Sequence, residues 1–344
     1  MRVKAIAFLI SALLAAVASG QTPAPANVDR VFHFTYTETA QDLEETAMVI
    51  RAIAEMQQVS VDTAQKTMSA RGTTGQIALA DWLVSQLDKP TNPPASGQQN
   101  SATHQGLSGN GDDVVQVFYI AHADTMQSFQ EMVTSVRSIV DMRWTFTYNA
   151  LRAVTVRGTA GQVALAEWLY SELDKPTNGQ ALALQNSAIH QGPSGNGDDV
   201  VRVFYLTHTG TAQNLQEIAT SVRSTGNIRR LFTYNALSAV TVRGTAAEIG
   251  LAEWLLGELD NPTKVQGTHE YRLAGSADDV VRVFYLTPTN TVASFQKICT
   301  QVRSATEIRR LFTYNAPRAA MARGTTNQIA LAERMFSELD KPAN

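Results

Sequence analysis

The residues of this chain that could do chemistry are scattered, and each has a structural alternative. None of the six histidines lies at helical i, i+4 spacing from another ligand type in a zinc-like constellation. No Ser/His/Asp arrangement, phosphate loop or pair of catalytic carboxylates is recognisable. The sequence therefore predicts no enzyme, no metal site and no cofactor.

Two short segments match the GxxG pattern of loops that clamp nucleic-acid phosphates, Gly72–Gly75 and Gly158–Gly161. Such a loop lies between two helices, whereas these segments fall between a predicted strand and a helix. The equivalent segments further along the chain lack the second glycine, with Ala247 and Asn327 in its place. We therefore interpret them as strand exits and helix caps. His104 and His190 are interpreted as polar linker residues.

Charged residues recur at fixed positions and are the better candidates for a functional surface. Four arginines each close a predicted strand: Arg71, Arg157, Arg243 and Arg323. Four aspartates each end a predicted helix, where a carboxylate is unfavourable unless it has a partner: Asp88, Asp174, Asp260 and Asp340. Either a turn hydrogen bond or a local Arg–Asp pair would satisfy them, and a contact between modules is the more specific hypothesis.

These charges recur because the chain repeats one unit four times. The Arg-Gly-Thr tripeptides are spaced by 86, 86 and 80 residues. A strand-opening valine lies 41 residues before each glycine, and Leu-Asp with a nearby proline follows each tripeptide. Constant internal lengths with variable connectors indicate one fixed core. The predicted domains are a leader over residues 1–20 and modules over residues 28–90, 114–176, 200–262 and 280–342.

The third copy shows the expected elements of a module best. Val200–Leu206 is rich in β-branched and aromatic residues and predicts a strand. Leu215, Ile218, Ala219 and Val222 follow at the spacing of one helix face. Two strands around a turn at Asn235, where asparagine tolerates the backbone, predict a hairpin. A second helix begins at Thr245, with Glu248 completing a capping box.

Each module is therefore predicted to be an α+β unit of the order β-α-β-β-α. Its three-stranded sheet would carry both helices on one face. Adjacent aromatic residues in the first strand must point to opposite faces of the sheet. One of each pair thus points away from the helices, and the tyrosines Tyr119, Tyr205 and Tyr285 join the recurring charges in the candidate interaction surface.

The ends and connectors of the chain complete this organisation. Arg2 and Lys4 precede a short apolar run with a small-residue exit, the pattern of a secretory signal peptide. Its removal leaves a net charge of -5 and predicts a soluble, exported protein, periplasmic or secreted. The polar connectors Thr91–Gly111 and Thr177–Gly197 predict flexible linkers. Cys299, the single cysteine, is expected to be a small buried apolar residue.

The repeated pattern resembles the periplasmic N-terminal modules of bacterial secretins. The resemblance is carried by Val203–Leu206, Asn235, Val242–Thr245 and Leu259–Pro262, and by their counterparts in the other copies. It implies a KH-like β-α-β-β-α fold that builds rings in secretion and pilus systems. The first copy departs most, because it lacks the Phe-Thr-Tyr-Asn-Ala string of the others. The sequence has two residues after Pro342, so we expect no pore-forming domain, and the resemblance implies an oligomerising or docking module rather than a channel.

Two functions remain open from the sequence. The first is an exported, non-enzymatic scaffold that assembles with protein partners or with itself at the bacterial envelope. The second is an exported module that binds a polymer such as peptidoglycan or nucleic acid. Complementary helix and sheet faces would favour the scaffold. A continuous stripe of exposed aromatic or basic side chains across the modules would favour polymer binding.

Overall fold

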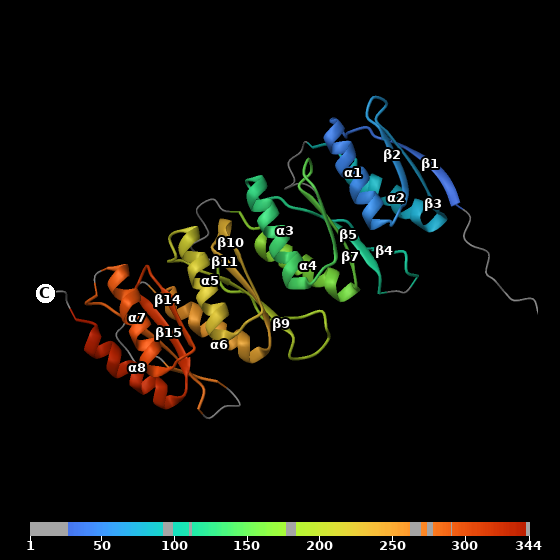
Figure 1. The fold of residues 1–344 in the computed structure, drawn as a ribbon. Helices are drawn as coiled ribbons and strands as arrows, with labels where there is room; N and C mark the ends of the chain where they lie inside the picture. Colours follow the sequence, from blue (N-terminus) through green and yellow to red (C-terminus); the bar gives the residue numbers. More distant parts are fainter. Residues whose placement is uncertain are drawn as a thin grey trace, which may run out of the picture.

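The protein is a row of four α+β modules (Figure 1). The computed structural model describes residues 27–91, 99–109, 112–176, 184–261, 270–273, 278–289 and 291–341. The predicted leader and most of the third connector lie outside these residues. Among the described residues, no helix is both long enough and apolar enough to cross a membrane.

Every module contains the predicted order of strand, helix, hairpin and helix. Module 1 consists of β1 (Asn27–His33), α1 (Ala40–Ile53), β2 (Gln58–Asp62), β3 (Thr67–Thr73) and α2 (Thr74–Leu87). Module 2 consists of β4 (His104–Gln105), β5 (Val114–Tyr119), α3 (Met126–Val140), β6 (Trp144–Tyr148), β7 (Ala153–Gly158) and α4 (Ala160–Leu173).

Modules 3 and 4 repeat the arrangement of module 2. Module 3 consists of β8 (His190–Gln191), β9 (Val200–Tyr205), α5 (Ala212–Gly226), β10 (Arg230–Tyr234), β11 (Ala239–Gly244) and α6 (Ala246–Leu259). Module 4 consists of β12 (Glu270–Arg272), β13 (Val280–Tyr285), α7 (Val292–Thr306), β14 (Arg310–Tyr314), β15 (Ala319–Gly324) and α8 (Thr326–Leu339). The predicted α+β fold of four repeated modules, each an antiparallel sheet with helices, is confirmed.

The sheets differ from the prediction in one respect. Module 1 has the expected three strands in the order β1-β3-β2, but the others have four, as in β4-β5-β7-β6. The extra strand comes from the preceding connector: His104 and Gln105 pair with Val115 and Val114. The interpretation of this connector as a flexible linker is therefore wrong for its described part, because its backbone groups are bonded to the first strand of the next sheet.

Capping explains where the second helix of each module begins. The predicted capping box is present at Thr245/Glu248, and the equivalent boxes are present at Thr73/Gln76, Thr159/Gln162 and Thr325/Gln328. The glycine of each Arg-Gly-Thr makes room for this cap, since a Cβ at Gly244 would lie 2.4 Å from Glu248 Oε2. Both GxxG matches are thus helix starts, as predicted.

The hydrophobic core of each module continues into the next one. One cluster combines the helices of module 2 with Val201, Val203, Tyr205 and Tyr234 of module 3. The corresponding clusters join module 1 to module 2 and module 3 to module 4. The sheet of each following module is therefore largely apolar on both faces, which is why its first strand is apolar at every position except Gln116, Arg202 or Arg282 rather than alternating.

Cys299 should be unreactive in the folded protein. It is 2% exposed on α7, as predicted, and burial raises the pKa of its thiol to about 12. Because the thiolate is the reactive form, a disulfide reagent at pH 8 should modify Cys299 only after urea unfolds module 4. Rapid stoichiometric reaction of the native protein would contradict this placement.

Candidate functional site: the joints between modules

The recurring polar residues gather where one module meets the next. At each of three joints, the first helix of one module packs on the outer face of the next sheet, the face its own helices leave uncovered. The pairs are α1 with β6 and β7, α3 with β10 and β11, and α5 with β14 and β15. Adjacent modules can be followed in this order along Figure 1.

The arginine of each Arg-Gly-Thr reaches across the joint to the end of the preceding helix. Arg243 Nη1 donates to the carbonyl oxygens of Ile139 (2.8 Å) and Val140 (3.2 Å), at the C-terminus of α3. Those carbonyls have no partner within the helix, and a cation is favourable at this negative end. Arg157 reaches Ile53 O at 2.9 Å, and Arg323 reaches Thr225 O at 3.3 Å.

The same guanidinium is held in its own module by an aspartate. Arg243 Nε and Nη2 each donate at 2.7 Å to the Asp199 carboxylate, a bidentate pair. This pairing holds the pKa of Asp199 at about 2. Arg157 holds the pKa of Asp113 at about 2 in the same way. Asp279 pairs with Arg323. Arg157 and Arg243 are 6% and 8% exposed, and each guanidinium nitrogen of Arg243 donates a hydrogen bond.

Arg71 is the exception among the four arginines. Its side chain is 52% exposed and its nearest carboxylate, Asp29, lies 3.6 Å away. No module among the described residues precedes β1, so Arg71 has no helix end to bind. The sequence predicts one role for all four arginines, whereas the structure places only Arg157, Arg243 and Arg323 in joints.

A glutamate–asparagine pair sits at the other end of each joint. Glu131 Oε1 on α3 accepts from the backbone N–H (3.0 Å) and the side-chain amide (2.6 Å) of Asn235. Glu45 binds Asn149, and Glu217 binds Asn315, in the same manner. Burial raises the pKa of Glu131, while the bond from Asn235 opposes this.

The asparagine at each hairpin turn has a different role from the one that the sequence predicts. The sequence predicts that it supplies an unusual backbone conformation, but the positive φ angles fall on Arg152, Ser238 and Arg318. The asparagine is needed because its backbone and side-chain amides together match one carboxylate of the preceding module.

The recurring tyrosines also bind across the joints. Tyr205 Oη donates to Glu172 O at 2.8 Å, near the end of the second helix of the preceding module. Tyr119 and Tyr285 bind Gln86 O and Glu258 O in the same way. Burial raises the pKa of all three phenols, that of Tyr285 to about 12. They are therefore neutral donors at any physiological pH.

Contacts between aromatic rings close the side of the joint. Trp168 on α4 stacks on His190 of β8, with 4.6 Å between ring centroids. Trp82 lies against His104, and Trp254 against Tyr271. His104 and His190, which the sequence predicts to be polar linker residues, are thus packed on tryptophan.

The aspartates that end the second helices act within their own modules. Asp174 Oδ2 accepts from Ala121 N at 2.7 Å, and its Oδ1 accepts from His122 N at 2.6 Å, in the loop after β5. Asp88, Asp260 and Asp340 bind the equivalent loops. Of the two alternatives left open, the structure shows the turn hydrogen bonds.

Replacing Asp174 with alanine should lower the free energy of unfolding by about 1–3 kcal/mol, because two loop N–H groups lose their acceptor. Asparagine keeps one acceptor oxygen and should cost less. Urea denaturation of both variants checks this order. Equal stability of Asp174→Ala and the wild type would show that water replaces the carboxylate without loss.

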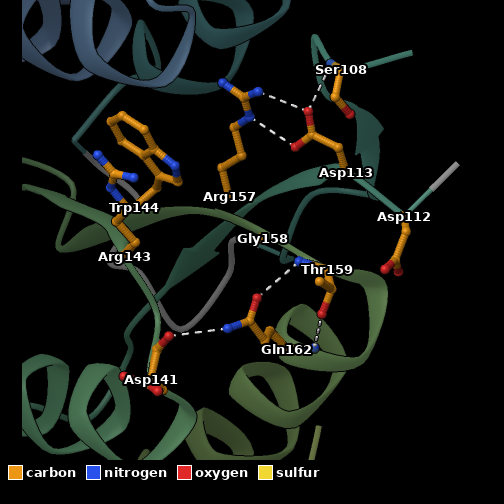
Figure 2. Close-up of a pocket in the computed structure, with 10 residues that line it drawn as sticks. All are labelled: Ser108, Asp112, Asp113, Asp141, Arg143, Trp144, Arg157, Gly158, Thr159 and Gln162. Carbon is orange, nitrogen blue, oxygen red and sulfur yellow. Dashed lines mark hydrogen bonds and ion pairs between the residues drawn. The ribbon is translucent and has the colours of Figure 1, made fainter. Parts of the chain in front are cut away.

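An open pocket of about 380 Å³ lies beside Arg157 (Figure 2). Its polar groups bind one another: Asp113 accepts from Arg157 and from Ser108 N, and Gln162 donates to Asp141 O. Trp144 there becomes Arg230 and Arg310 in the later modules, so the pocket is not repeated. Within the described residues, no group of three or more His, Cys, Asp or Glu could hold a metal ion.

Two recurring partners at each joint are not predicted by the sequence patterns. They are the helix glutamates Glu45, Glu131 and Glu217, and the strand-entry aspartates Asp113, Asp199 and Asp279. Both sets recur at the repeat spacing but in three copies rather than four. That incomplete recurrence is the signal in the sequence. Four modules in a row form three joints, so each partner in a joint is needed in three of the four copies.

Comparison with known proteins finds structural likeness alone. No protein-family model matches this chain, and no curated protein does. Secretin ExeD of Aeromonas hydrophila is 15% identical over 67% of this chain and 42% of its own, with a TM-score of 0.16. The N-terminal domain of the secretin XcpQ from Pseudomonas aeruginosa is 12% identical over 43% of this chain and 62% of its own, with a TM-score of 0.18.

The type II secretion system secretin GspD of E. coli K12 is 11% identical over 76% of this chain and 42% of its own, with a TM-score of 0.16. This chain thus spans less than two thirds of each of these proteins. Such TM-scores carry no argument about function or about how the modules are arranged. The modules are similar in structure to secretin N-terminal domains, at low sequence identity.

Proposed function

We propose that this protein is an exported, non-enzymatic scaffold that acts through protein–protein contacts at the bacterial envelope. The observation that carries the proposal is the joint, built three times from the same residue types. A repeated helix-on-sheet joint turns four small modules into one continuous body, because each core continues into the next module. Such a body can hold partners at fixed separations.

The alternative, polymer binding, predicted a stripe of exposed aromatic or basic side chains, and the aromatic half of that prediction can be compared with the joints. The recurring tyrosines are instead buried or half-buried at the joints and donate to carbonyls there. Among the described residues, Tyr36 is the exposed aromatic side chain, at 48%. The placement of the aromatic residues thus favours the scaffold. The resemblance to secretin modules implies the envelope as its site of action.

Photo-crosslinking in cells of the source organism tests this function. A photoreactive amino acid is placed at Met48 or Met126, which are 57% and 44% exposed on the first helices of modules 1 and 2. We expect a processed protein in the envelope fraction, crosslinked to a discrete protein. A variant with an opened joint, Val203→Asp, should lose crosslinks that depend on the spacing of modules.

Two outcomes would count against the scaffold. A cytoplasmic, unprocessed chain would contradict export. A crosslinked species that disappears on muramidase or nuclease treatment, and is unchanged by Val203→Asp, would identify a polymer ligand instead.

A further inference from the structure

Each joint depends on a set of apolar positions on the sheet of the following module. In module 3 these positions are Val201, Tyr205, Phe232, Tyr234 and Leu237, all packed in the cluster that contains α3 and α4. The face is formed by alternate residues of β9 and β10, together with the hairpin turn. It is apolar in the same way in modules 2 and 4.

The equivalent face of module 1 is polar at these positions, although Val31, at the position of Val203, stays apolar and is 49% exposed. The repeat spacing places Asp29, His33, Ser60, Asp62 and Gln65 where module 3 carries its valine, tyrosines, phenylalanine and leucine. All five are exposed, and the Asp29 side chain is 76% exposed. Covering this face with a helix would remove the carboxylates of Asp29 and Asp62 from water, which is costly.

Module 1 also lacks the hydrogen-bonding half of a joint. Thr63 replaces the asparagine that binds the preceding glutamate, and Asn27 replaces the aspartate that holds the arginine. Arg71 remains but is half exposed. A helix placed on this face would find neither the donor pair nor a fixed guanidinium.

The outer face of α7 in module 4 shows the reciprocal changes. Lys297 stands where the other first helices carry the joint glutamate, and Gln301 replaces the buried Ser135 and Ser221. Ala305 replaces the buried Ile53, Ile139 and Thr225. Lys297, Gln301 and Ala305 form one exposed stripe along α7.

The second helix of module 4 changes at the same side. Arg334 replaces the tryptophan that stacks on the next connector, and it is exposed. An apolar stripe of Leu331, Met335 and Leu339 remains half-buried on α8. In a head-to-tail contact between two copies, that stripe would meet the face with Asp29 and His33 rather than valine and tyrosine.

We propose that these two faces are caps, so that the stack stops at four modules and a second copy of this chain cannot extend it. A head-to-tail contact is heterologous, and without caps it would generate open filaments. Polar outer faces on the end repeats are the general solution to this hazard in stacked repeat proteins. Here the joint asparagine is missing from module 1 and the joint glutamate is missing from α7.

Restoring the faces tests the proposal. One variant restores the sheet face, with Asp29→Val, Ser60→Phe, Asp62→Tyr and Thr63→Asn. Another restores the helix face, with Lys297→Glu, Gln301→Ser and Arg334→Trp. Sedimentation over a wide concentration range should show the wild type and each variant as monomers. An equimolar mixture should form a one-to-one dimer, and a chain carrying all seven changes should form oligomers that lengthen with concentration.

Two results would overturn the caps. The first is a mean mass of the wild type that rises with concentration, together with a lower mean mass of the Lys297→Asp variant at the same concentration. That pair of results would show a working head-to-tail contact. The second is a seven-change chain that stays monomeric with a native circular dichroism spectrum. If the substituted chains do not fold, the wild-type mass alone tests the caps: a monomer at every concentration supports them, and a mass that rises with concentration and is lowered by Lys297→Asp contradicts them.

Discussion

Replacing Arg243 with alanine should lower the free energy of unfolding by about 3–5 kcal/mol, because it leaves a buried charge without its partner. The side chain is 8% exposed, and Asp199 and two helix-end carbonyls all lose their donor. Lysine should recover little, since one ammonium cannot reproduce the bidentate pair and the carbonyl bonds together. Urea denaturation at pH 7 measures the effect.

Arg71→Ala is the matched control, at the same repeat position in module 1. Its half-exposed ion pair at 3.6 Å should contribute within about 0.5 kcal/mol. If the two variants lose equal stability, the position matters within the module rather than at the joint.

Acid should reduce the difference between wild type and Arg243→Ala. The folded pKa of Asp199 is about 2, below its unfolded value of about 3.9. A depressed folded pKa stabilises the protein above the unfolded pKa, and this contribution is lost as pH falls through the folded pKa. The variant lacks the contribution, so the two unfolding free energies should converge between about pH 4 and pH 2. A constant difference over that range would exclude the ion pair as its source.

Val203→Asp should open the joint between modules 2 and 3. Val203 is fully buried in the cluster of module 2, while its neighbour Phe204 points into the core of module 3 itself. An unpaired carboxylate there costs roughly 4 kcal/mol or more, which the chain avoids by separating the modules. Hydrogen exchange should rise along α3 and the outer face of β9 to β11, while the far-ultraviolet circular dichroism is retained.

Val31→Asp provides the matched control, because Val31 holds the same position in module 1 and is 49% exposed. It should leave hydrogen exchange and stability close to wild type. Loss of all secondary structure in Val203→Asp would instead show that module 3 cannot fold apart from its neighbour.

The fold follows from local patterns that the sequence displays four times. The capping threonines, the i, i+3, i+4, i+7 stripe on α5 and the β-branched strands each specify an element without reference to distant residues. The fourth strand escaped prediction because a two-residue strand such as His104–Gln105 has no periodicity of its own. Its place is set by pairing with β5 and by the ring of Trp82.

The joints were predictable in part. The adjacent aromatic residues Phe204 and Tyr205 point to opposite faces of the sheet, so the sequence predicts that both faces are covered. It does not show what covers it, because the partners Glu131 and Asn235 are 104 residues apart and look like ordinary surface residues. The informative feature is the exception: the asparagine is missing from the first copy and the glutamate from the last.

Small-angle X-ray scattering of this protein tests most directly whether helix-on-sheet joints fix the four modules in one stack. The scattering curve should match the arrangement in Figure 1 and be independent of concentration, and Val203→Asp should increase the maximum dimension. A wild-type curve typical of four independently moving beads on tethers, indistinguishable from that of Val203→Asp, would contradict the account.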